Sequence, residues 1–190
     1  MAKRMFIAVD LSKEARAAAA GMISAAEQDF PDAKVKWEFP AKLHLTLRFL
    51  GPVDDRKVAY VLNAVRTAAT FTKLFNITLA GAGVFPNTRR PRVIWLGVRE
   101  GREELTGLAN GLEEALPAEY LQGEHREFSP HCTIGRIKAP ESCRKLVHAL
   151  EDRPFEPVSW TVNEIVLYES VLLPTGSVYS AIERVTLFLG

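Results

Sequence analysis

The sequence predicts an α+β fold made of two similar halves, and three observations support this prediction. Strand-like and helix-like segments recur in one order along the chain, a constant offset of 87 residues aligns the two series, and a His-x-Thr motif occurs once in each. A chain of 190 residues is long enough for one sizeable core and short for two independent domains. We therefore expect a single domain over residues 1–190 with an internal repeat.

Hydrophobic periodicity and turn residues define the elements of the first half. Ser12 is the expected N-cap of an Ala-rich helix that Pro31 ends, and Asp54 is the expected N-cap of the second helix. Gly51 and Pro52 are expected to close the strand before it. In chain order, strands are expected over 5–11, 35–38, 43–50 and 75–81, and helices over 13–30 and 54–70.

A polar, Pro-containing stretch from Phe85 to Pro91 predicts an exposed turn, after which the order of elements begins again. Strands are expected over 93–98, 130–136, 163–170 and 177–189, and helices over 102–116 and 141–150. The offset of 87 carries His44 onto His131, Thr46 onto Thr133 and Asn76 onto Asn163. Each half is thus expected to be a ferredoxin-like β-α-β-β-α-β unit with a mostly antiparallel sheet.

Composition excludes several classes of protein. The formal net charge is +1, so no whole-molecule field attracts nucleic acid, and phosphate binding must come from local clusters such as Arg89, Arg90 and Arg92. The apolar run near the N-terminus is too short for a signal peptide, and no run reaches the length of a membrane span. Cys132 and Cys143 form neither a disulfide framework nor a metal-ligand pattern. We expect a cytoplasmic monomer without cofactor or metal.

The two His-x-Thr motifs lie in strand-like alternation. In the first, Leu43, Leu45 and Leu47 share one expected face of the strand, and His44, Thr46 and Arg48 share the other. In the second, His131 and Thr133 form the polar face, whereas Arg136 falls one residue off the alternation and needs a bulge, which Gly135 permits. Random placement predicts roughly 0.2 such motifs in a chain of this composition, so a matched pair is unexpected by chance.

Two imidazoles and neighbouring hydroxyls suit phosphoryl chemistry near neutral pH. A neutral histidine accepts a proton from water while a protonated one donates a proton to the leaving oxygen, and each contributes about 10²–10⁴-fold. Thr46, Thr133, Arg48 and Arg136 are the candidate groups for binding the non-bridging oxygens. No acidic or Cys side chains stand at ligand spacing around the histidines, so a metal site is not expected.

The doubled motif resembles that of the 2H phosphoesterase superfamily. The flanking phrases resemble one branch, the RNA 2′,3′-cyclic phosphodiesterases, historically called 2′-5′ RNA ligases: FIAV (6–9), LHLTLRFLG (43–51), GVFP (83–86), PRVIWLGV (91–98) and LYES (167–170). The resemblance implies two lobes flanking a central cleft, metal-free hydrolysis of a terminal 2′,3′-cyclic phosphate to a 2′-phosphate, and an RNA or oligonucleotide substrate. It implies that His44 protonates the departing O3′, that His131 activates water, and that Thr46 and Thr133 hold the phosphate. Cys132 departs from the family, which usually has a larger aliphatic there, and only a packing change is expected.

Simpler interpretations stand beside these. Histidines on strands can be structural, Arg48 can be a solvated charge, and the cluster Arg89–Arg92 can be an ordinary polar loop instead of a grip on RNA backbone. His125 and His148 are interpreted as surface residues, and Trp37, Phe85 and Tyr168 as core or rim aromatics that could also stack on a base. The rival functions are 2′-5′ RNA ligation at the same site and a non-catalytic RNA- or nucleotide-binding module.

Overall fold

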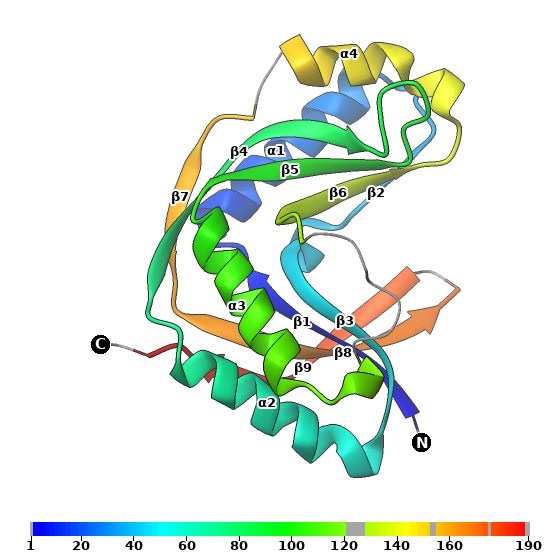
Figure 1. The fold of residues 1–190 in the computed structure, drawn as a ribbon. Coiled ribbons are helices and arrows are strands. Elements are labelled where there is room, and N and C mark those ends of the chain that lie inside the picture. The colour runs from blue at the N-terminus through cyan, green and yellow to red at the C-terminus, as the bar shows by residue number, and fades with distance from the viewer. Residues whose placement is uncertain (1, 121–127, 153–154, 175, 189–190) are drawn as a thin grey trace.

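The computed structural model describes residues 2–120, 128–152, 155–174 and 176–188, and it has the predicted α+β class (Figure 1). A nine-stranded antiparallel sheet runs in the order β7-β4-β5-β6-β3-β1-β8-β9, with β2 paired on β6. The strands are β1 (Ala2–Asp10), β2 (Val35–Trp37), β3 (His44–Asp54), β4 (Phe75–Phe85), β5 (Val93–Glu100), β6 (His131–Ile137), β7 (Val158–Val162), β8 (Glu164–Leu173) and β9 (Gly176–Thr186). The α-helices are α1 (Lys13–Asp29), α2 (Val58–Thr70), α3 (Arg102–Ala115) and α4 (Arg144–Asp152).

The strand order is symmetric about the junction of β3 and β6. Moving outward from that junction, β3, β1, β8 and β9 on one side match β6, β5, β4 and β7 on the other. Helices α2 and α3 pack with the first group, and α1 and α4 with the second (Figure 1). We call these groups the first lobe and the second lobe. The predicted two-lobed arrangement is confirmed.

The lobes do not coincide with the two halves of the sequence. Strand β4 and helix α1 come from the first half but belong to the second lobe, whereas α3, β8 and β9 come from the second half and complete the first lobe. In its described residues the second half also has the order β-α-β-α-β-β-β, not the expected β-α-β-β-α-β. Strand β7 was not predicted because it is short and follows Pro157; pairing with β4 and the hydrogen bond from the Thr161 hydroxyl to Asn76 hold it.

The boundary expected at Gly51 and Pro52 is wrong. Strand β3 continues through both residues to Asp54, because Gly51 adopts a left-handed conformation (φ 69°) at a bulge against β1 and the pairing then resumes. A 3₁₀ turn over Asp55–Lys57 follows, so α2 begins at Val58 and not at Asp54. The Asp54 carboxylate still accepts the Arg56 N–H (3.0 Å) as a cap of that turn.

The α1 boundary and its cap are confirmed. The Ser12 hydroxyl accepts the Ala15 N–H (3.1 Å), and α1 ends at Asp29, before Pro31. The buried side of α1 is formed by Ala15, Ala19 and Ala26 together with the larger Ile23. Among the described residues, no helix is long and apolar enough to cross a membrane.

Two glycines, one just before α3 and one inside it, provide a matched test of how α3 begins and packs. Gly101 precedes the helix with φ 79°, and a Cβ there would lie 2.4 Å from Ile77 Cγ2. Gly107 lies inside the helix, and a Cβ there meets nothing within 4 Å. We expect Gly101→Ala to lower the free energy of unfolding by more than about 1 kcal/mol and Gly107→Ala to raise it by about 0.5–1 kcal/mol. Urea denaturation of both variants measures this, and equal effects would contradict the packing at Gly101.

Candidate active site

The first motif projects His44, Thr46 and Phe49 from one face of β3. Along β1, the alternate residues Asp10, Ala8 and Phe6 are the pairing partners of these three residues in turn. Directly paired residues of an antiparallel sheet point to the same side, so the regular alternation of β1 fixes the side chains of β3.

Arg48 does not share that face, contrary to the prediction. A bulge places Arg48 opposite the fully buried Ile7, and its guanidinium lies 3.5 Å from the Tyr120 carbonyl and 3.9 Å from the Glu113 carboxylate of α3. Leu47 is the extra residue of the bulge and reverses the alternation after Thr46. Phe49, which is 53% exposed, occupies the position expected for Arg48.

The second motif projects His131, Thr133 and Arg136 from one face of β6. Their partners on β5 are Gly97, Trp95 and Val93, which alternate regularly. The extra residue is Ile134, so the bulge that the sequence required for Arg136 is present.

The two motifs meet at the symmetry axis of the sheet. Leu45 of β3 pairs with Cys132 of β6, and these residues are themselves 87 apart in the sequence. Extending this antiparallel register by one residue sets His44 beside Thr133 and Thr46 beside His131, so the histidines lie diagonally across one face. The bulged residues Leu47 and Ile134 are also 87 apart, which makes the bulge a feature of the repeat.

Both imidazoles are anchored in the same way. Nδ1 of His44 lies 2.6 Å from the Lys42 carbonyl oxygen, and Nδ1 of His131 lies 2.7 Å from that of Ser129. A carbonyl only accepts, so Nδ1 carries the proton in each ring and Nε2 is left to accept or donate. Each anchor lies two residues before its histidine, so this contact repeats with the same offset.

His44 is enclosed by aromatic rings. Phe6 lies 4.9 Å from its ring centroid, and the ring of Tyr179 approaches at 5.6 Å, close to perpendicular. This burial lowers the pKa of His44; the Lys42 carbonyl and the carboxylates of Asp10 and Glu38 oppose the change. Burial therefore favours the neutral form of His44.

The segment that anchors His44 is itself held by charged side chains. The guanidinium of Arg16 on α1 donates to the carbonyls of Pro40 (3.0 Å) and Ala41 (2.7 Å). The ammonium of Lys42 donates to the Ser177 carbonyl (2.6 Å) at the tip of the β8–β9 hairpin. These bonds fix the turn whose last carbonyl orients the His44 ring, and neither Arg16 nor Lys42 was identified from the sequence.

On the other side of the site, His131 meets a different aromatic pair. The ring centroid of Phe85 lies 5.0 Å from that of His131 with the two rings close to perpendicular, and the ring of Trp95 lies 5.1 Å from that of Phe85. Arg136 extends from the same face, 3.4 Å from Glu38, and its side chain is 59% exposed. His131 thus has a cation on its strand where His44 has Phe49.

The remaining predicted residues are placed as follows. Cys132 is fully buried, which raises the pKa of its thiol to about 12, in agreement with the expectation that it faces away from the site. Tyr168 stacks on Phe6 (5.2 Å) and donates to Asp10, and Trp37 packs against the core beside Gly135. His148 is exposed on α4, whereas His125 lies outside the described residues.

The geometry defines a two-lobed protein with paired, pseudo-symmetric His-x-Thr strands, and comparison with known proteins agrees. Residues 12–171 match the model of the 2′-5′ RNA ligase superfamily, and the chain belongs to this family. The RNA 2′,3′-cyclic phosphodiesterase of Methanothermobacter thermautotrophicus is 36% identical over 96% of this chain and 98% of its own, and that of Thermotoga maritima is 34% identical over 94% and 92%.

Solved structures share the whole fold. A Thermus thermophilus protein superposes with a TM-score of 0.75 at 33% identity, covering 97% of both chains. E. coli LigT in complex with 3′-AMP superposes with a TM-score of 0.72 at 26% identity, covering 98% of this chain and 99% of that one.

The shielding of His44 makes a prediction about its protonation. We expect its imidazole to titrate below the ordinary value in NMR spectra, and Tyr179→Ala to move the pKa back toward that value by admitting water. Because the unfolded chain then binds the proton more tightly, the free energy of unfolding falls as the pH drops below the ordinary imidazole pKa. The decline ends below the folded-state pKa. In His44→Gln this component of the decline should vanish; an imidazole that titrates at its ordinary value would contradict the shielding.

Proposed function

We propose that this protein hydrolyses the terminal 2′,3′-cyclic phosphate of RNA to a 2′-phosphate, using His44 and His131 as acid and base. The observation that carries the proposal is the matched pair of imidazoles on adjoining strands, each with Nδ1 held by a carbonyl and Nε2 available. Membership of the family supports the same activity.

The reaction is an in-line displacement at phosphorus. Nε2 of His131 takes a proton from water as the new P–O bond forms, and His44 gives its proton to O3′ as the P–O3′ bond breaks. The 2′-oxygen keeps the phosphate. Thr46, Thr133 and Arg136 donate to the non-bridging oxygens, whose charge grows in the transition state.

The two sides of the site differ in a way that supports this assignment. Phe49 is 53% exposed and lies beside Phe6, which itself adjoins His44. Phe49 therefore offers an apolar surface to the terminal nucleoside, which carries the leaving oxygen. The negative charge of a bound cyclic phosphate favours the imidazolium form of His44 and opposes the burial that lowers the pKa of this residue. Binding of substrate thus favours the protonated form of His44, which is the form that acts as the acid.

The direct test is hydrolysis of a short RNA that ends in a 2′,3′-cyclic phosphate, with chelator present. The wild type should convert this end to a 2′-phosphate that stays on the RNA, with a bell-shaped pH profile, and His44→Ala and His131→Ala should each lose about 10²–10⁴-fold in rate. As a control, His148→Ala changes an exposed histidine of α4 and should keep full activity. Loss of activity in chelator with recovery in Zn²⁺ would overturn the metal-free mechanism, and wild-type levels in both histidine variants would leave only a binding surface.

The two arginines should separate by phenotype. Arg136→Met removes a donor to the phosphate, and because a hydrogen bond to a charged group contributes about 1.5–3 kcal/mol, kcat/KM should fall about 10- to 100-fold at unchanged stability. Arg48→Met leaves the Tyr120 carbonyl and Glu113 without this partner and should lower the free energy of unfolding by about 1–3 kcal/mol. Activity of the folded Arg48 variant should stay near wild type. A large loss of kcat/KM in Arg48→Met at unchanged stability would instead show that Arg48 acts in the active site.

A further inference from the structure

Exposed cationic side chains continue the active-site face beyond Arg136. Lys36 of β2 is the direct partner of Arg136 on β6, so the two side chains point to the same side of the sheet as His131. Lys36 is exposed, and the tip of the β8–β9 hairpin at Gly176 lies near its ammonium group.

The pairing of the two segments continues past the strand ends. The Lys138 N–H donates to the Lys34 carbonyl (2.7 Å), one step beyond the pair of Val35 with Ile137. Since side chains alternate, Lys34 and Lys138 return to the face of Lys36 and Arg136, and both are exposed. Two successive rows of cations therefore lead away from the histidines along one face.

The turn between β4 and β5 adds three arginines at the same end of the sheet. Its base is closed by the Arg92 N–H on the Phe85 carbonyl (2.7 Å), and Ile137 of β6 donates to the Arg92 carbonyl (2.9 Å). The Asn87 side chain accepts hydrogen bonds from the N–H groups of Arg89 and Arg90 (3.1 Å each), so the backbone of the turn has a defined conformation.

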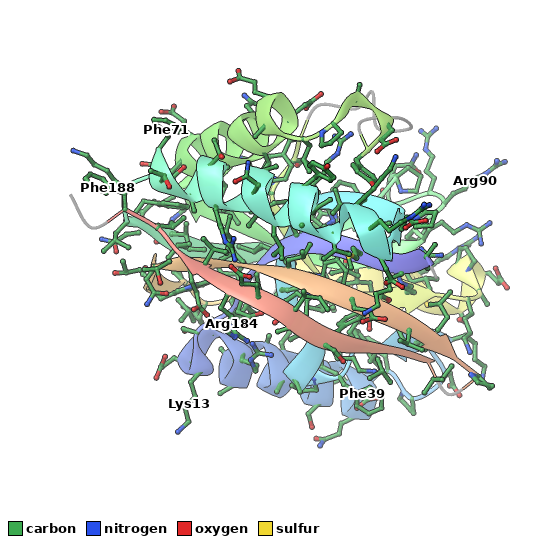
Figure 2. The ribbon with its side chains drawn as sticks, turned by 90° about the horizontal axis from the view of Figure 1, so that it is seen from below. Lys13, Phe39, Phe71, Arg90, Arg184 and Phe188 are labelled. Atoms are coloured by element: carbon green, nitrogen blue, oxygen red, sulfur yellow. The ribbon has the colours of Figure 1, made fainter. Side chains whose placement is uncertain are left out.

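These guanidinium groups are available to a ligand. Arg89, Arg90 and Arg92 are exposed and form no ion pair with any carboxylate in the described part of the chain. Figure 2 shows Arg90 extending from one end of the molecule, opposite the end that carries Phe71 and Phe188. The net charge of the whole chain is only +1, so any attraction for phosphates must come from a local cluster such as this one.

We propose that these side chains form a backbone-binding track for single-stranded RNA, and the proposal rests on the function proposed above. The track consists of Lys34, Lys36, Lys138, Arg89, Arg90 and Arg92. A 2′,3′-cyclic phosphate closes the 3′ end of an RNA, so every other phosphate of the substrate lies on the 5′ side of the terminal ribose. Cations that lead away from the histidines are placed to bind those phosphates, which makes an oligoribonucleotide, and not a cyclic mononucleotide, the preferred substrate.

The experiment compares a 2′,3′-cyclic mononucleotide with a hexaribonucleotide that ends in the same group. Wild type should show at least about tenfold higher kcat/KM on the hexamer at low salt, and this advantage should shrink as salt rises. Arg89→Gln/Arg90→Gln and Lys34→Gln/Lys138→Gln should each lose at least about tenfold on the hexamer and stay within twofold of wild type on the mononucleotide. Each lost phosphate contact should reduce the logarithmic salt slope by about 0.7.

The control is Lys13→Gln/Lys73→Gln, which removes two exposed lysines distant from the track: Lys13 begins α1 away from Arg90, and Lys73 bridges to Phe188 at the opposite end (Figure 2). It should behave as wild type on both substrates. Equal rates of wild type on hexamer and mononucleotide, or track variants that match the control, would overturn the track and leave the proposed function standing.

If wild type hydrolyses neither substrate, the proposed function fails, and binding tests the track by itself. Fluorescence anisotropy with a 3′-phosphorylated hexaribonucleotide should show at least about tenfold weaker binding for both track variants than for the control. Binding that does not change among these proteins would overturn the track whatever the enzymatic result.

Discussion

The contact between Leu45 and Cys132 organises the whole molecule. It joins β3 to β6, and thereby the first lobe to the second, at the axis that relates the two halves. Because side chains alternate, the residues on either side of this buried pair must emerge together on the opposite face, and those residues are the two histidines and the two threonines. Both partners are almost completely buried, so a change in their packing would move both motifs at once.

A symmetric scaffold here supports an asymmetric site. The same bulge follows each motif, at Leu47 and at Ile134, and brings forward the residue five places after each histidine. That residue is Phe49 in one strand and Arg136 in the other. One backbone device therefore gives an aromatic surface beside the buried imidazole and a cation beside the other, as a reaction with distinct leaving and attacking groups requires.

Sequence patterns predicted most of the elements and the two His-x-Thr strands, because alternation and helical spacing are local properties. The order expected for the second half was wrong. The patterns placed Arg48 on the wrong face of the strand, because simple alternation does not allow for the extra residue of a bulge. The 87-residue offset pairs Arg136 with Phe49 and not with Arg48, and this offset could have predicted which residue shares the face of His44. Strand β7 was missed because its stability comes from pairing with β4. The roles of Arg16 and Lys42 arise from contacts between distant segments, for which the sequence held no pattern.

The exchange of elements between lobes interlocks the two halves of the chain. Strand β4 and helix α1 are embedded in the second lobe, and α3, β8 and β9 in the first, so neither half contains a complete core of its own. The exposed turn at residues 86–90 is the point where the halves join. A single cut in that turn would leave two fragments held together by shared sheet and buried apolar surface, and each fragment would carry one histidine of the pair. We therefore expect that neither fragment is active alone and that activity returns only when the two fragments associate.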